Sequence, residues 1–277
     1  MLERLKLLSL FGLANGVAKT SPLHKEGQRE NGMGSIIDPD RSRIAAVIPA
    51  YNEVLTVEAV VRGALRHVKA VVVVDDGSSD GTAAAAALAG AAVIAHSVNR
   101  GKGVALRSGF TWALRHGFDL VFTLDADGQH DPDEMPRFIE AYAQTQADLI
   151  IGRRTYASMP LIRRWANRIG RWLLKLALGQ DVPDNQSGYR LYSQRLLKLL
   201  QAPEDVQSPT RFSYEVDVIA RAVGAGYSIA WVPIRTIYGG EQSHFHPLRD
   251  SLDFLRTVWQ VWQTRRATIR QQRRGGG

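Results

Sequence analysis

Short apolar runs rich in β-branched residues alternate with helix-like segments between residues 44 and 151. The runs that we expect to form strands are Ile44–Ile48, Ala70–Val74, Ala91–Ala95, Leu120–Leu124 and Asp148–Ile151. The helices predicted between them cover about Glu53–His67, the segment from Ser79, about Gly103–His116 and the segment from Pro132. Apolar strands of this kind are typical of parallel sheets that are buried on both faces. The sequence therefore predicts an α/β fold, with a mostly parallel central sheet and helices on both faces.

A polar cluster with turn-forming residues follows each predicted strand. In chain order the clusters are Pro49–Glu53, Asp75–Thr82, Asn99–Gly103, Asp125–Gln129 and Gly152–Arg154. Turn or helix-start chemistry explains any one of them alone. A parallel sheet, however, brings the carboxyl ends of its strands to one edge, where α/β proteins bind their ligands. Clusters after all of these strands therefore favour a binding site at that edge.

The cluster after the fourth strand carries oxygen ligands at close spacing. Asp125 and Asp127 are two positions apart in the sequence LVFTLDADGQHDP, and Gln129 adds an amide oxygen. Carboxylate and amide oxygens suit Mg²⁺ or Mn²⁺ better than zinc. The alternative is a structural turn in which Asp131 caps the following helix. The neighbouring clusters make a metal site the better prediction.

The chain has a formal net charge of +8 and contains no cysteine. Disulfides and thiolate metal sites are therefore excluded, and the chemistry depends on oxygen and nitrogen groups. The arginine clusters lie mostly after residue 150. This asymmetry predicts a polyanionic partner such as a membrane surface, a phosphorylated substrate or nucleic acid. Since no nucleic-acid recognition module is visible, we expect no nucleic-acid partner.

Three segments combine apolar stripes with basic residues and are candidates for attachment to an anionic membrane surface. They are the Leu-rich residues 1–14, residues 161–176 with Trp and Leu at helical spacing, and residues 248–274. Such helices can lie in a membrane interface, where each Lys or Arg near an anionic leaflet contributes about 1 kcal/mol. An ordinary helix packed on the sheet explains residues 161–176 equally well. No apolar run reaches the roughly 20 residues of a membrane-spanning helix.

These patterns divide the chain into three parts. Residues 1–43 are predicted to be an amphipathic segment with a flexible linker, residues 44–246 a folded domain, and residues 247–277 an amphipathic helix with a basic tail. The N-terminal charges are threaded through the apolar residues, unlike those of a cleaved signal peptide. We therefore expect a cytoplasmic protein that is peripherally associated with the membrane.

The polar clusters also carry a family resemblance. The motifs are Pro49-Ala50-Tyr51-Asn52-Glu53, Asp75-Asp76-Gly77-Ser78, Asn99-x-Gly101-Lys102-Gly103, Asp125-x-Asp127-x-Gln129 and Ser187-Gly188-Tyr189-Arg190. With these motifs the domain resembles glycosyltransferase family 2 of the GT-A fold. Within that family it is similar to the polyprenyl (dolichyl) phosphate sugar synthases without appended transmembrane helices. The resemblance implies a metal-dependent glycosyltransferase that moves a sugar from a nucleotide-diphosphate sugar to a polyprenyl phosphate at the cytoplasmic membrane face.

The resemblance also implies roles in binding the donor. It places the nucleotide base and ribose against Pro49, Tyr51, Glu53 and Asp76. It places a Mg²⁺ or Mn²⁺ ion that bridges the diphosphate on Asp125, Asp127 and Gln129. The departing diphosphate also benefits from cationic side chains, for which the nearest candidates are Lys102, Arg153 and Arg154. For each of these three, a solvated surface charge is an equally good interpretation.

The second half of the chain is expected to bind the acceptor. The family places the segment around Arg190 near the acceptor phosphate, and Arg154 and Arg164 are further candidate phosphate ligands. A hydroxyl acceptor needs a general base, and Glu215 is the one loosely placed carboxylate in this half. A phosphate acceptor has a second pKa of about 6, so it is already largely ionised at neutral pH and needs mainly positioning. The sequence therefore favours a phosphate acceptor and an inverting direct attack, with Asp127, Arg190 and Glu215 as the catalytic candidates.

Two alternatives and several details stay open at this point. The chain could transfer sugar to a lipid or saccharide hydroxyl, or it could bind a nucleotide sugar without catalysis. A loop with Gly239 and Gly240 as hinges is expected to close over the donor. It continues into Ser243-His244-Phe245-His246, where the family has a more basic ending. The roles of His244 and His246, the donor base and sugar, the carrier length and the oligomeric state are left open.

Overall fold

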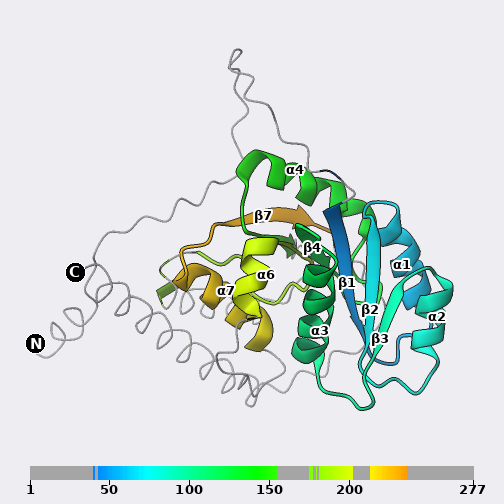
Figure 1. Ribbon diagram of the computed structural model, residues 1–277. Coiled ribbons are helices and arrows are strands. Elements are labelled where there is room, and N and C mark those ends of the chain that lie inside the picture. The colour runs from blue at the N-terminus through cyan, green and yellow to red at the C-terminus, as the bar shows by residue number, and fades with distance from the viewer. Residues whose placement is uncertain are drawn as a thin grey trace, which may run out of the picture.

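A computed structural model describes residues 40, 43–154, 175–176, 179, 181–201 and 213–235. These residues form a seven-stranded sheet with the order β3-β2-β1-β4-β6-β5-β7 (Figure 1). The strands are β1 Ile44–Ala50, β2 Ala70–Asp75, β3 Ala92–Ala95, β4 Leu120–Thr123, β5 Leu149–Arg154, β6 Arg190–Ser193 and β7 Ile229–Ile234. The helices are α1 Val57–Leu65, α2 Thr82–Leu88, α3 Lys102–Arg115, the 3₁₀ helix η2 Pro132–Glu134, α4 Met135–Thr145, α6 Gln194–Leu200 and α7 Ser213–Gly224. The predicted α/β fold is confirmed.

One strand of the sheet runs against the others. β1 pairs in parallel with β2 and β4, β2 with β3, and β5 with β7. β6 is antiparallel to both of its neighbours, β4 and β5. Its sequence, RLYS, has no apolar run, and this strand was not predicted from the sequence. Because β6 is reversed, its first residue lies at the edge where the parallel strands end.

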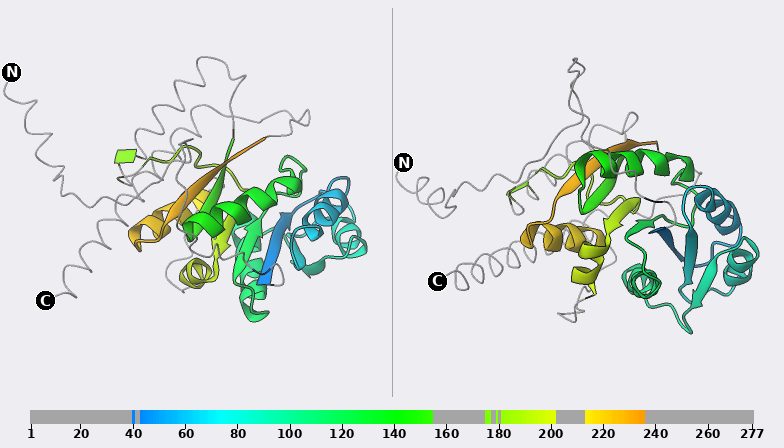
Figure 2. Two further views of the ribbon diagram at one scale, coloured as in Figure 1. Left: turned by 90° about the horizontal axis from the view of Figure 1, so that it is seen from above. Right: turned by 45° about the horizontal axis from the view of Figure 1, so that its top comes forward.

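The sheet lies between two helical layers. Side chains alternate along each strand, so Ile44, Ala46 and Ile48 of β1 pack toward α1, α2 and α4. Ala45 and Val47 of the same strand pack on the opposite face, toward α3, α6 and α7. Figure 2 shows these two groups of helices on opposite sides of the sheet. The expectation of helices on both faces is therefore confirmed.

Two helices begin later than the sequence predicts. The helix expected from about Glu53 begins at Val57, and the helix expected from Ser79 begins at Thr82. Before α2, Gly81 has a φ of 90°, which is favourable for glycine and strained for other residues. The Asp80 carboxylate also accepts hydrogen bonds from the backbone N–H and the hydroxyl of Thr82. The polar clusters before α1 and α2 therefore contribute more residues to the loops at the carboxyl edge than the sequence predicts.

Several predicted segments lie outside the described residues. They are the N-terminal amphipathic segment and linker, most of residues 161–176, the loop with Gly239, Gly240, His244 and His246, and residues 247–277. The division of the chain at residues 43 and 246 stays a prediction. Among the helices that the structure describes, none combines the length and apolar character needed to cross a membrane.

Asp148 connects three strands at the edge opposite the predicted site. Its carboxylate is almost fully buried just before β5. It accepts hydrogen bonds from Arg195 Nε at 3.0 Å and Nη2 at 2.7 Å. The hydroxyl of Ser193, at the end of β6, donates at 3.0 Å, and the backbone N–H and hydroxyl of Ser228, just before β7, both donate at 3.1 Å. The carboxylate therefore joins the ends of β5, β6 and β7.

We expect Asp148→Ala to lower the free energy of unfolding by about 2 kcal/mol, because donors on three segments lose their common buried acceptor. Chemical denaturation measures this change. Asp133→Ala is the control, since that carboxylate is 59% exposed and pairs with Arg66 and His67 at the surface. Its expected loss is below about 1 kcal/mol. Equal losses for the two variants would contradict the role of Asp148.

Candidate active site

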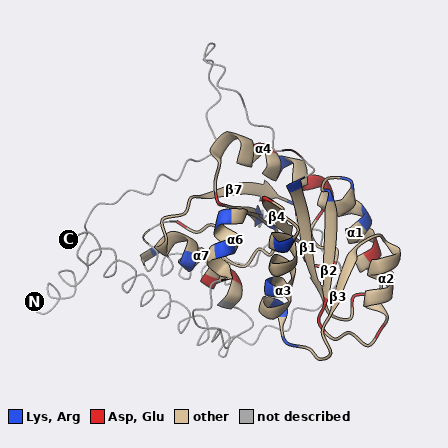
Figure 3. Ribbon diagram, viewed as in Figure 1, with Lys and Arg blue, Asp and Glu red and all other residues tan. Residues whose placement is uncertain are grey.

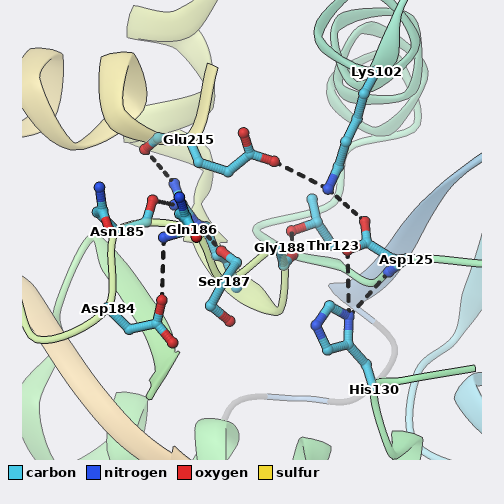
Figure 4. Close-up of polar contacts among 11 residues, drawn as sticks. Lys102, Thr123, Asp125, His130, Asp184, Asn185, Gln186, Ser187, Gly188 and Glu215 are labelled. Atoms are coloured by element: carbon cyan, nitrogen blue, oxygen red, sulfur yellow. Dashed lines mark hydrogen bonds and ion pairs between the residues drawn. The ribbon is translucent and has the colours of Figure 1, made fainter. Parts of the chain in front are cut away.

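The predicted clusters meet at the carboxyl edge of the sheet, beside β4 and β6. Thr123, the last residue of β4, pairs with Arg190 of β6. The Thr123 hydroxyl donates a 2.7 Å hydrogen bond to the carbonyl oxygen of Gly188 (Figure 4). A Cβ on Gly188 would stand 2.7 Å from Asp125 Oδ2 and 2.9 Å from Lys102 Nζ. Any larger residue at this position would therefore have to displace the Asp125 or Lys102 side chain.

Lys102 bridges two carboxylates at the centre of the site. Its Nζ lies 2.6 Å from Asp125 Oδ1 and 3.0 Å from Glu215 Oε1 (Figure 4). Lys102 begins α3, Asp125 lies in the loop after β4, and Glu215 lies in the first turn of α7. The structure therefore brings together three predicted site residues that stand far apart in the sequence.

The neighbouring charges affect the pKa values of Lys102 and Asp125 more strongly than burial does. Burial alone would lower the pKa of Lys102, but the carboxylates of Asp125 and Glu215 raise it well above its usual range. Burial alone would raise the pKa of Asp125, but its neighbours, Lys102 first among them, lower it to about 2. Both groups are therefore charged at neutral pH.

The loop after β4 is held by two residues that were not predicted from the sequence. The backbone N–H of Asp125 donates to His130 Nδ1 at 3.2 Å, and burial lowers the pKa of this imidazole. The His130 ring packs against Tyr189 with 5.2 Å between centroids. The Tyr189 hydroxyl donates to the backbone oxygen of Asp131 at 3.0 Å. His130 directly follows the Asp125–Gln129 cluster, and Tyr189 lies within the Ser187-Gly188-Tyr189-Arg190 motif. These positions were the sequence signal for a role of both residues in the site.

Asp127 and Gln129 complete the predicted metal loop. The backbone N–H of Gln129 donates to Asp127 Oδ1 at 2.9 Å. Within the described ranges, no three or more His, Cys, Asp or Glu side chains group as a metal site. Mg²⁺ is commonly held by one or two carboxylates, with substrate phosphates and water supplying the other ligands. Two carboxylates and an amide oxygen therefore fit an ion that binds together with a diphosphate, but they do not form a closed protein cage.

Asp76, predicted to bind the donor's base or ribose, holds a loop in this structure. Its buried carboxylate accepts hydrogen bonds from the backbone N–H groups of Arg100 and Gly101 and from His96 Nδ1 at 2.7 Å. The other ring nitrogen of His96 lies 3.0 Å from the Ser108 hydroxyl. These donors use most of the acceptor capacity of the carboxylate. Asp76 thus fixes the backbone that leads to Lys102.

The first polar cluster is tied to the second by short hydrogen bonds. The backbone N–H of Asn52 donates to the Ser78 hydroxyl at 2.9 Å, and the backbone N–H of Glu53 donates to the Thr82 hydroxyl at 2.8 Å. Tyr51 is 47% exposed. Pro49 lies near the end of β1, beside Val74 of β2. The two clusters therefore form one surface at the carboxyl edge, as the binding of one ligand by both would require.

The predicted phosphate-binding arginines have different surroundings. Arg154 binds the buried Asp184 carboxylate through Nε at 2.8 Å and Nη2 at 3.0 Å. Burial opposes ionisation of Asp184, but Arg154 outweighs it and lowers the pKa. Arg153 is exposed. Both arginines lie within β5, whereas the sequence predicted that they follow the strand. Arg164 lies outside the residues that the structure describes.

Arg190 does not occupy the position that was predicted from the sequence. Its side chain is fully buried. Nε donates to the carbonyl oxygen of Ser187 at 2.8 Å, Nη1 to that of Glu215 at 2.9 Å, and Nη2 to that of Asn185 at 3.4 Å. Buried carbonyl groups require such donors. In this position Arg190 braces the segment before β6 against α7 and is not open to an acceptor phosphate.

The fold has clear counterparts among solved structures. Glucosyl-3-phosphoglycerate synthase from Mycobacterium tuberculosis, crystallised with Mn²⁺, uridine diphosphate and phosphoglyceric acid, superposes with a TM-score of 0.63 and 22% identity. The superposition covers 90% of this chain and 87% of that one. The same enzyme crystallised with Mg²⁺ and uridine diphosphate gives a TM-score of 0.61 at 23% identity, covering 86% of this chain and 84% of that one. Fold and site together define the GT-A class of transferases.

Residues 45–200 match the family model described as glycosyl transferase family 2. The chain belongs to this family and is a glycosyltransferase. Polyprenol monophosphomannose synthase of Mycolicibacterium smegmatis is 34% identical over 231 residues, covering 75% of this chain and 83% of the relative. Undecaprenyl-phosphate mannosyltransferase of Micrococcus luteus is 32% identical over 205 residues, with coverages of 69% and 82%. The predicted resemblance is therefore confirmed.

Proposed function

We propose that the protein transfers a sugar from a nucleotide-diphosphate sugar to a polyprenyl phosphate, with inversion at the anomeric carbon. The observation that carries the proposal is the cluster of Asp125, Asp127 and Lys102 at the carboxyl edge of the sheet. Relatives named for transfer to polyprenyl phosphates support the acceptor. The GT-A structures that bind uridine diphosphate support a nucleotide-linked donor.

Asp125, Asp127 and Gln129 would hold a Mg²⁺ or Mn²⁺ ion. Such an ion stabilises the negative charge that develops on a departing diphosphate. Lys102, at the start of α3, supplies a second positive charge at the same place. The loops that contain Tyr51, Glu53 and Thr82 lie at the same edge and are suited to bind the nucleotide.

The surroundings of Glu215 favour a phosphate acceptor. A hydroxyl acceptor needs a general base that can take up its proton. Glu215 is largely buried, and its Oε1 is already paired with the Lys102 ammonium group at 3.0 Å, so this oxygen is not free to accept the proton of a hydroxyl acceptor. A phosphate monoester needs no such base.

Binding at the cytoplasmic membrane face is the remaining part of the proposal. α3 and α6 carry only Lys and Arg among their charged residues, and Figure 3 shows these along the two helices. Lys102 and Arg195 are paired with carboxylates, so Arg107, Arg115 and Lys198 are the candidates to face anionic lipid. Both helices cover the same face of the sheet. A surface of this sign is attracted to anionic lipids. The basic segments predicted at residues 161–176 and 248–274 would add to the attraction.

The test is transfer of label from a panel of nucleotide sugars to a short polyprenyl phosphate in detergent, with Mg²⁺ or Mn²⁺ against EDTA. We expect metal-dependent label in the lipid phase, and its loss in Asp127→Ala with an unchanged circular dichroism spectrum. Donor hydrolysis without labelled lipid would redirect the search to a hydroxyl acceptor. If no donor is consumed under any of these conditions, the chain is a nucleotide-sugar binding module and the proposal fails.

A further inference from the structure

We propose that Lys102 is an internal counter-cation of Asp125, which a divalent cation must displace, and that Glu215 retains Lys102 when this happens. The inference rests on the proposed metal-binding role of Asp125. It goes beyond that role because it assigns a competitor to the cation and a positioning function to Glu215.

The distance between Lys102 and Asp125 makes the competition direct. Nζ stands 2.6 Å from Asp125 Oδ1. A Mg²⁺ ion binds a carboxylate oxygen at about 2.1 Å, and two cations on one oxygen repel each other strongly in a partly buried site. The ammonium group and the metal ion therefore cannot share Oδ1. Metal binding at this oxygen is an exchange of one cation for another.

The second oxygen of Asp125 offers no easier route. A metal ion on Oδ2 would still lie close to the Lys102 ammonium group on the same carboxylate, and the two cations would repel each other. The His130 ring lies on the same oxygen's side, with Nδ1 at 3.9 Å. A divalent cation on either oxygen of this carboxylate therefore competes with Lys102.

Glu215 lowers the free-energy cost of the exchange because it offers Lys102 a second partner. A partly buried ammonium group without a partner is unfavourable. Glu215 Oε1 is 3.0 Å from Nζ on the side away from Asp125 (Figure 4). The Arg190 guanidinium donates to the Glu215 carbonyl and holds the start of α7 in place. When a metal ion takes Oδ1, one ion pair of Lys102 is lost and the other remains.

The exchange predicts that a divalent cation alone binds this protein weakly. The Lys102 ammonium group already lies 2.6 Å from Asp125 Oδ1, so the competitor is in place before a metal ion arrives. A diphosphate changes this balance, since it adds ligands to the metal and a further anion for Lys102. Metal and diphosphate are therefore expected to bind cooperatively.

The test is a titration of the full chain with Mn²⁺ alone, in which electron paramagnetic resonance measures the concentration of the free ion. The decisive variant is Lys102→Met/Glu215→Gln, which removes one positive and one negative charge and leaves the net charge unchanged. We expect it to bind Mn²⁺ at least about tenfold more tightly than the wild type, because the competitor is gone. Adding Asp125→Asn should abolish the gain.

A matched control removes a pair of the same two charges elsewhere. Arg62→Met/Glu58→Gln disrupts an exposed pair on α1, with Nε 2.9 Å from Oε1, and should leave Mn²⁺ binding unchanged. Equal Mn²⁺ affinity in Lys102→Met/Glu215→Gln and the wild type would overturn the exchange. If Mn²⁺ then still binds with uridine or guanosine diphosphate through Asp125, the proposed function stands without it. If no variant binds Mn²⁺, with or without these nucleotides, the metal site and the exchange both fail.

Discussion

Asp125→Asn should lower the rate of sugar transfer by about a thousandfold or more. A metal ion stabilises a developing negative charge by several kcal/mol, and an amide is a much weaker ligand for it than a carboxylate. The substitution also frees Lys102 from its 2.6 Å contact, so that the ammonium group moves toward Glu215. The measurement is the initial rate at saturating donor, with Mg²⁺ and with Mn²⁺.

The fold should tolerate this change, because asparagine has nearly the shape of aspartate and the backbone N–H of Asp125 keeps His130 as its acceptor. Asp133→Asn is a suitable control, since that carboxylate follows the same loop but pairs with Arg66 and His67 at the surface. Its activity should stay within about twofold of the wild type. If Asp125→Asn kept a tenth of the wild-type rate or more, Asp125 would not be a ligand of an essential metal ion.

The sequence predicted most of the sheet because each parallel strand leaves a visible apolar run. β1 to β5 follow such runs within a few residues of the expected ends, and β7 also lies on a mostly apolar run, IAWVPI. β6 leaves no run, since it is short and begins with an arginine. Its pairing depends on β4 and β5, which flank it on both sides. That kind of support comes from tertiary structure, and no local pattern reports it.

The site was predictable in its residues but not in its contacts. Asp125, Lys102 and Glu215 were all candidates in the sequence, yet their meeting depends on how α3 and α7 pack on the sheet. The same limit explains the arginines. Their positive charge is visible in the sequence, but the carbonyl groups around Arg190 and the Asp184 partner of Arg154 are not. From the sequence alone, an arginine that is already bound within the fold therefore cannot be distinguished from one that is free to bind a phosphate.

Gly188→Ala should lower the rate of transfer by about a hundredfold, because the added methyl group would press against both Asp125 and Lys102. The added Cβ would stand 2.7 Å from Asp125 Oδ2, 2.9 Å from Lys102 Nζ and 3.0 Å from Asp125 Oδ1. The carboxylate must then shift, and a displacement of about 1 Å in a catalytic group can cost a hundredfold in rate. The Thr123 hydroxyl limits the alternative, since its 2.7 Å bond to the Gly188 carbonyl holds the backbone in place. The measurement is the initial rate of transfer beside the free energy of unfolding.

Gly117→Ala separates this effect from a general loss of stability. Gly117 has a φ of 75°, and an added Cβ would have nothing within 4 Å, so alanine there strains the backbone without touching the site. It should cost about 1 kcal/mol in the free energy of unfolding and leave the rate unchanged. Gly188→Ala should show the reverse pattern, with a large loss of rate and Mn²⁺ affinity at a similar or smaller loss of stability. If Gly188→Ala were as active as Gly117→Ala, the Asp125 carboxylate could move aside without loss of activity. The close approach of Gly188 to Asp125 would then have no part in the chemistry.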